Sequence, residues 1–227
     1  MESHTLARLQ FGLRIALLLV LICGAVLVSA TLRPSARTLD EFRAAVAAGE
    51  VDRVTWRGDD FGIWELHWSE SPLVWHEVPG NGLTADSGTY MLARFYEDLD
   101  RAPVRPSIEQ MTHRGGSIVP DWPFRFAGGG ALLWLAAAWL IAFVVMVASR
   151  PRLGNRWAWF WLFTVGEIGA PLFLVLEPRP LWKGPGPGAA ESTPISGRRG
   201  CLYSILLGII SAVLALGIGE LVRLLLG

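Results

Sequence analysis

The sequence contains little lysine, little cysteine and no long run of charges of one sign. Lys183 is the single lysine among 20 basic residues, and 20 acidic residues balance them to a net charge of zero. Because the charges are scattered, no basic stripe offers a surface for nucleic acid. Cys23 and Cys201 lie in or beside apolar runs without a CxxC or Cys/His spacing, which gives no support to a disulfide framework or a structural zinc site.

The motifs of the common catalytic sites are also lacking. The chain has no G-x-x-x-x-G-K-[ST] phosphate loop, no His-Glu-x-x-His zinc pair and no G-x-S-x-G nucleophile turn. We therefore assign no catalytic residue, no cofactor and no metal ligand, and we predict that the protein is not an enzyme.

Apolar residues, in contrast, are abundant, at 52% of the chain with a mean hydropathy of +0.40. A helix needs about 20 apolar residues to cross a bilayer core of roughly 30 Å. Four runs are apolar over about that length: 15–32, 126–149, 157–176 and 201–219. We predict a mainly α membrane protein with four transmembrane helices and a small α+β extracytoplasmic domain between the first and second.

The first run also has features of a cleavable signal peptide. Val28, Ser29 and Ala30 provide small residues after a suitable apolar region. The run is long for a signal peptide, and three later runs already commit the chain to the membrane. These observations favour a retained anchor, with cleavage as the alternative.

The predicted organisation begins and ends in the cytoplasm. The segments outside the four runs are a cytoplasmic N-terminus (1–14), an extracytoplasmic module with its tether (33–125), a basic loop (150–156), a Pro/Gly-rich linker (177–200) and a cytoplasmic C-terminus (220–227). The basic loop sets this orientation through Arg150, Arg152 and Arg156, because short cytoplasmic loops carry an excess of Lys and Arg. The arginine, alanine, glycine and tryptophan content is typical of a bacterium of high GC content, which favours a multi-pass protein of the bacterial plasma membrane.

The extramembrane segment has the pattern of a small α+β module. Thr38 and Glu41 form a capping box and Gly49 a stop signal, which together predict a helix over 39–48. A strand follows, and then a hairpin of 61–68 with 73–78. Pairing Trp68 with Leu73 across its loop would place one set of residues on a core face: Trp64, Leu66, Trp68, Leu73 and Trp75. A second amphipathic helix is predicted over about 88–101.

The apolar pattern of this module resembles the extracytoplasmic module of FtsH-type membrane proteases. The residues that carry the resemblance are Leu39, Phe42, Val46, Gly49, Val51 and Val54. Protease and ATPase activity do not carry over, since the zinc pair and the phosphate loop are missing. A second stretch, residues 154–161, resembles uncharacterised multi-span membrane proteins of actinobacteria, which implies an origin without a function.

Glu167 is the single charge inside the third apolar run. A charge at the bilayer centre costs about 2.5 to 3.5 kcal/mol, so such residues often serve transport or proton relay. The structural alternative, which we favour, is a neutral glutamic acid that makes one interhelical hydrogen bond. Counting residues from the interfaces places Ser211 and Trp139 at the same depth as candidate partners.

A hydrophilic cluster is predicted on the exposed face of the hairpin. In the assumed register His76 lies opposite Glu65 and diagonal to His67. Two histidines and a carboxylate suit zinc or a pH switch, whereas solvated surface residues are the simpler interpretation.

These observations predict a non-catalytic interaction or sensing subunit that displays its small module outside the membrane. The alternative is a small transporter or channel component that uses Glu167. The expected partners are the lipid bilayer and other membrane proteins or further copies of the chain, and not nucleic acid.

Overall fold

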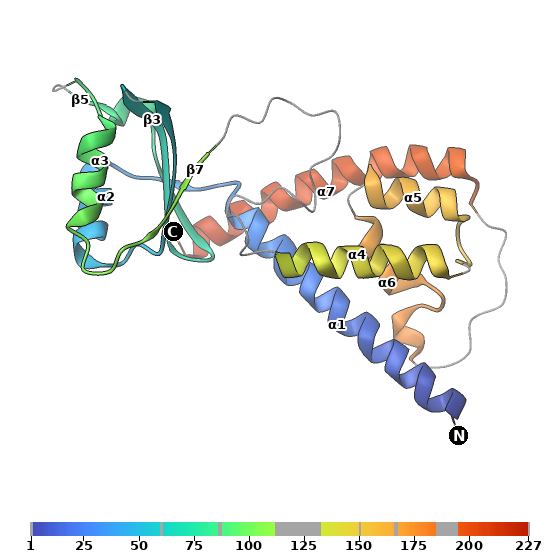
Figure 1. Cartoon of the computed structure of the whole chain (residues 1–227). Coiled ribbons are helices and arrows are strands. Elements are labelled where there is room, and N and C mark those ends of the chain that lie inside the picture. The colour runs from blue at the N-terminus through green and yellow to red at the C-terminus, as the bar shows by residue number, and fades with distance from the viewer. Residues whose placement is uncertain are drawn as a thin grey trace. The chain divides into compact units, whose positions relative to one another are not determined.

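The computed structural model describes residues 2–59, 61–85, 88–111, 133–149, 151–165, 168–184 and 195–226. Two compact units account for them, and each is treated by itself (Figure 1). Among the described residues, the first unit comprises those of 2–25 and 133–215, and the second comprises those of 26–111 and 216–226.

The prediction of a mainly α protein with four transmembrane helices is wrong. In the part of the chain that the structure describes, two helices are long and apolar enough to cross a membrane, the Ala7–Ala30 portion of α1 (Glu2–Ala30) and α7 (Gly197–Leu226). The rest of the regular structure in the described residues consists of five further α-helices, a mixed five-stranded sheet, a two-stranded sheet and short 3-10 turns, so the chain has an α+β fold.

Within the described residues, the two middle runs form helices that are shorter than a bilayer span requires. α4 (Leu133–Ala148) has 16 residues, or about 24 Å at 1.5 Å per residue, and residues 126–132 lie outside the described part. The predicted third span is divided into α5 (Arg156–Thr164) and α6 (Gly169–Leu176). α6 folds back onto α5 because Gly169 has no side chain, and a Cβ there would overlap the α5 backbone.

The two long helices are apolar and largely uncovered by the rest of the chain. Only 17% of the most apolar part of α1 and 6% of that of α7 is buried. This separates them from core helices of soluble proteins, which are mostly buried. On α7 the exposed large side chains include Leu202, Ile205, Leu206, Ile209, Ile210, Val213 and Leu214. Apolar surface of this extent is typical of a helix that meets lipid or another apolar partner.

The second unit contains the sheet. Its elements are β1 (Ser35–Ala36), α2 (Leu39–Ala48), β2 (Arg53–Asp59), β3 (Gly62–Ser71), β4 (Val74–Val78), the 3-10 turn η1 (Gly80–Gly82), β5 (Thr84–Ala85), β6 (Gly88–Thr89), α3 (Leu92–Asp100) and β7 (Ser107–Gln110). The strand order is β1-β4-β3-β2-β7, with β1 parallel to β4 and β7 parallel to β2. α2 and α3 cover one face of this sheet (Figure 1).

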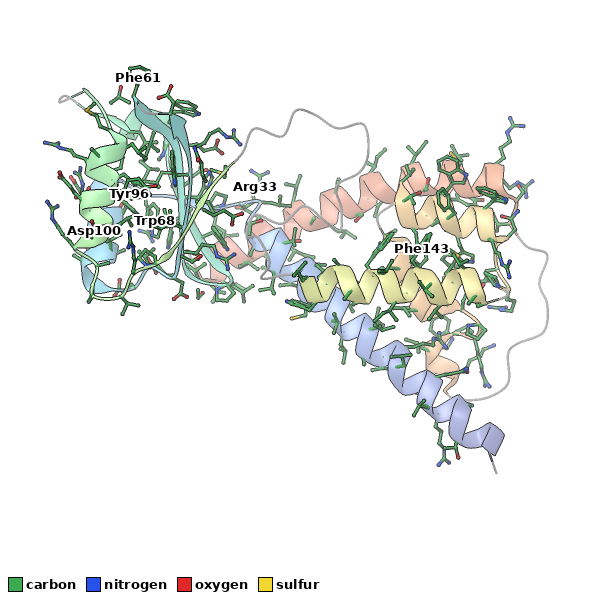
Figure 2. The ribbon with its side chains drawn as sticks, in the orientation of Figure 1. Arg33, Phe61, Trp68, Tyr96, Asp100 and Phe143 are labelled. Carbon is green, nitrogen blue, oxygen red and sulfur yellow. The ribbon has the colours of Figure 1, made fainter. Side chains whose placement is uncertain are left out.

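The helix predicted over 39–48 is confirmed. Thr38 and Glu41 form the expected capping box, and Gly49 ends the helix in the left-handed region at φ 75°. α2 buries Phe42 against Trp68, with ring centroids 5.3 Å apart. Trp68 lies between the sheet and the helices (Figure 2). The second predicted helix begins later than expected, at Leu92, because Gly88 and Thr89 belong to β6.

The predicted register of the hairpin is wrong. Trp68 pairs with His76, not with Leu73. β3 carries an extra residue at two points, Trp64 opposite β2 and Glu70 opposite β4. Such bulges reverse the alternation of side chains. Trp64 is therefore 51% exposed, and Ile63 takes its place in the core.

Candidate functional site

The predicted intramembrane site is only partly within the described structure, because Glu167 lies outside it. Trp139 is buried on α4, stacked on Phe143 at 5.3 Å and edge-on to Phe163 at 5.8 Å. Phe143 lies between α4 and α5 (Figure 2). Ser211 is half-buried on α7. Their role as partners of Glu167, and the transport function that depends on it, stay predictions.

Two of the three arginines predicted to set the topology are described, and both lie at the N-terminal end of α5. Arg150 lies outside the described residues, and Arg152 precedes the helix. Arg156 begins α5 and donates from Nη2 to the carbonyl of Ser149 at 3.3 Å. Their role in orientation stays a prediction.

The structure brings together only two members of the predicted cluster Glu65, His67 and His76. His67 Nε2 lies 3.2 Å from Glu65 Oε1, and Arg57 pairs with Glu65 at 2.8 Å. His76 is on the opposite face, under the helices and 2% exposed, because the bulge at Glu70 changes the register of β4. Among the described residues no group of three candidate ligands has metal-binding geometry.

His76 instead joins a polar contact that the sequence did not reveal. Parallel pairing of β1 with β4 places Ser35 opposite His76, and the Ser35 hydroxyl lies 2.6 Å from Nδ1. On the other side of the ring, Nε2 lies 3.3 Å from Oε1 of Glu70, without hydrogen-bond alignment. The imidazole packs on Trp68 at 5.1 Å between ring centroids. We call these residues, Ser35, His76 and Glu70, the β1 clasp.

Burial disfavours the protonated form of the imidazole in the β1 clasp. It lowers the pKa of His76 below its usual value, because the protonated ring loses its hydration. The carboxylates of Glu70 and Glu41 oppose this shift, and the guanidinium of Arg37 adds to it. In the neutral tautomer that carries its proton on Nε2, the Ser35 hydroxyl donates to Nδ1 and that proton is on the side of Glu70.

A serine, a histidine and a carboxylate in contact are also the ingredients of nucleophilic catalysis. That chemistry needs a substrate carbonyl beside the hydroxyl. Ser35 is 8% and His76 2% exposed. A cavity of about 380 Å³ is lined by Trp68 and Glu70, by residues of α2, and by Arg37 and Glu50 on either side of that helix. Neither Ser35 nor His76 belongs to its wall. The geometry therefore suits a buried contact that responds to protons better than a site that binds substrate.

No protein family, curated protein or solved structure matches this chain. The predicted resemblances to FtsH-type modules and to actinobacterial membrane proteins thus stay predictions.

Sequence reasoning missed the β1 clasp because its parts are far apart in the chain. Ser35 and His76 are separated by 41 positions and meet only through a two-residue parallel strand. Glu70 reaches His76 from a bulge. No local pattern marks either feature, and pairing of distant short segments leaves no periodicity.

Proposed function

We propose that the chain is a sensing protein of the bacterial plasma membrane, without catalysis of its own, whose extracytoplasmic module responds to acidification. α1 and α7 anchor it, and their exposed apolar surfaces support this part of the proposal. The observation that carries the sensing function is the contact of the buried His76 with Ser35 of β1. Proteins that bind the module would distinguish its docked state from the state in which β1 is released.

The position of β1 in the chain connects this contact to the anchor. α1 ends at Ala30 and β1 begins at Ser35, so four residues separate the helix from the strand. β1 contributes only two residue pairs to the sheet, with His76 and Glu77 as partners, and Arg37 adds one backbone bond to Glu77 at 2.9 Å. A strand held this weakly can be released without unfolding the core of the module.

Protonation favours release of β1. In the released state the imidazole is hydrated and has a pKa of about 6.5, whereas docking lowers it. Below pH 6.5 the released state therefore binds more protons than the docked state, and docking free energy is lost as the pH falls toward the lowered pKa. Above pH 6.5 the imidazole is neutral in both states, and the docking free energy of β1 has its full value.

Hydrogen exchange on the full-length protein in lipid nanodiscs tests the proposal. Protection of the backbone amides of residues 33–37, corrected for the intrinsic effect of pH on exchange, is expected to fall by up to about tenfold per pH unit below pH 6.5. His76→Gln should abolish this pH dependence. His67→Gln, which changes a histidine on the other face of the sheet, should preserve it.

The proposal is wrong if wild-type protection of residues 33–37 is the same at pH 5 and pH 7.5. It is also wrong if His76→Gln retains the dependence. Amides of α2 serve as an internal reference, since their loss of protection would mean that the module unfolds as a whole.

A further inference from the structure

One end of the first unit is basic, and α5 and α7 both begin there, side by side (Figure 1). We propose that this end binds the phosphodiester head group of an anionic phospholipid, and that Arg156, Arg198 and Arg199 hold it. The inference rests on the membrane anchoring proposed above. It does not depend on the pH response, because all of its residues belong to the first unit.

Backbone contacts join the starts of the two helices. Ile195, just before α7, accepts a hydrogen bond from the backbone N–H of Asn155 at 3.1 Å and donates one to the carbonyl of Leu153 at 2.9 Å. Gly197, the first residue of α7, lies against Trp157 of α5, since a Cβ on Gly197 would come within 3.2 Å of the Trp157 Cβ. The first turns of α5 and α7 are therefore neighbours.

Cations occupy both of these first turns. Arg156 is the first residue of α5, and Arg198 and Arg199 follow the first residue of α7. All three side chains are exposed, and neither first turn contains an acidic residue. Because a helix N-terminus carries a partial positive charge, backbone dipoles disfavour cations there and favour anions. Two such termini and three guanidinium groups give this end a positive potential that a bound anion relieves.

The acidic residues that the structure describes in the first unit lie elsewhere. Glu2 begins α1, whose start lies away from that of α7 (Figure 1). Glu177 is 1% exposed, and its Oε1 accepts a hydrogen bond from the backbone N–H of Leu153. A phosphate group suits the three arginines, because a guanidinium donates two parallel hydrogen bonds to phosphate oxygens and helix N-termini bind phosphate through backbone N–H groups.

Apolar surface next to the arginines favours a lipid over a soluble phosphate. Leu202 and Leu206 lie three and seven positions after Arg199, on the same face of α7, and are 66% and 54% exposed. Acyl chains that extend from a head group at Arg199 would cover them. Trp157 is 66% exposed beside this surface, and exposed indoles are typical of the interface between bilayer and water.

Native mass spectrometry of the full-length protein in detergent tests the site. The probes are dioleoyl phosphatidylglycerol and dioleoyl phosphatidylcholine, which have the same acyl chains and differ in net charge. We expect the wild type to bind the anionic lipid at least about tenfold more tightly. Combining Arg156→Gln, Arg198→Gln and Arg199→Gln should remove most of this preference, since each basic residue contributes roughly fivefold in affinity for anionic lipid.

Arg8→Gln is the matched control. Arg8 is also exposed and belongs to the same unit, but it lies on α1, so the preference should stay within about twofold of the wild type. The site is wrong if the triple variant keeps the preference, or if Arg8→Gln reduces it as much. Equal binding of the two lipids by the wild type would also overturn it, whereas binding of neither would contradict the membrane anchor itself.

A second measurement needs no variant. Phosphatidylglycerol with a diazirine on its acyl chain should label residues 202–209 of the wild type more than the matching phosphatidylcholine probe does, and equal labelling by both probes would overturn the site. Glycerophosphoglycerol, the head group without chains, should compete at least about tenfold more weakly than the lipid, since each buried CH₂ group contributes roughly fourfold. Equal competition would assign the arginines to a soluble phosphodiester and overturn the lipid.

Discussion

Asp98 is the residue on which the polar contacts of the second unit converge. This buried carboxylate accepts hydrogen bonds from Arg43 Nε at 2.8 Å, Tyr90 Oη at 2.7 Å and Arg101 Nη1 at 2.7 Å. Burial raises the pKa of the Tyr90 phenol well above its usual range, so it remains a donor throughout the physiological pH range. The network joins α2 to α3 and to the segment before it.

We predict that Asp98→Asn lowers the free energy of unfolding of the module by about 1–3 kcal/mol, because the partly buried guanidinium of Arg43 loses its buried carboxylate partner and keeps only the exposed Asp40. Asp100→Asn is the matched control. Asp100 lies on the same helix, labelled in Figure 2, and its pair with Arg105 is exposed. The control should change stability by less than about 0.5 kcal/mol.

Native-state hydrogen exchange of the α2 amides in the full-length protein measures the free energy of unfolding of the module in both variants. Equal effects of Asp98→Asn and Asp100→Asn would show that the network contributes nothing beyond surface charge.

At the scale of elements, the sequence predicted those features that are determined by residues close together in the chain. α2 could be read from Thr38, Glu41 and Gly49, because caps act within one turn of a helix. The strands of the hairpin were recognised from their composition. Their register was not, since the bulges at Trp64 and Glu70 exist only in relation to partner strands.

The same limit explains the error in the membrane segments. Hydropathy over 157–176 is continuous, and apolar length alone predicts a span. The division into α5 and α6 depends on tertiary contacts, in which Trp159 and Phe163 both meet Phe173 at 5.3 and 5.9 Å. These contacts hold two short helices against each other, and apolar residues that would suit lipid serve as packing surface.

Close helix packing at glycine gives a prediction at this scale. α7 approaches α5 at Gly200, where a Cβ would overlap the backbone of Ala158. At Gly217, also on α7, a Cβ would meet no described atom within 4 Å. Gly200→Ala should therefore cost about 1–3 kcal/mol through overpacking, while Gly217→Ala should gain about 0.5–1 kcal/mol through helix propensity.

Thermal unfolding of the detergent-solubilised full-length protein separates the two variants. We expect a lower midpoint for Gly200→Ala and an unchanged or higher one for Gly217→Ala. A higher midpoint for both would mean that α5 and α7 do not pack at Gly200.

At the scale of the whole molecule, the dominant feature is the apolar surface that α1 and α7 leave uncovered. The ends of the two helices approach each other within the second unit, where a Cβ at Gly219 would overlap the backbone of Ser29. Glu220 and Arg223 form an ion pair next to this contact. Their charges follow the uncharged stretch of α7, as expected where a helix leaves an apolar phase.

The depth of each position along α7 predicts how far a charge is tolerated. Ile210, 43% exposed, lies near the middle of the uncharged stretch, and Leu225, 72% exposed, lies near its charged end. In a bilayer, Ile210→Arg should cost about 2.5–3.5 kcal/mol, whereas Leu225→Arg can extend its guanidinium to the interface at little cost. We therefore expect Ile210→Arg alone to reduce the fraction of protein that resists alkaline carbonate extraction from membranes. Equal retention of both variants would indicate that α7 lies against protein or on the membrane surface, because only a spanning helix distinguishes its middle from its end.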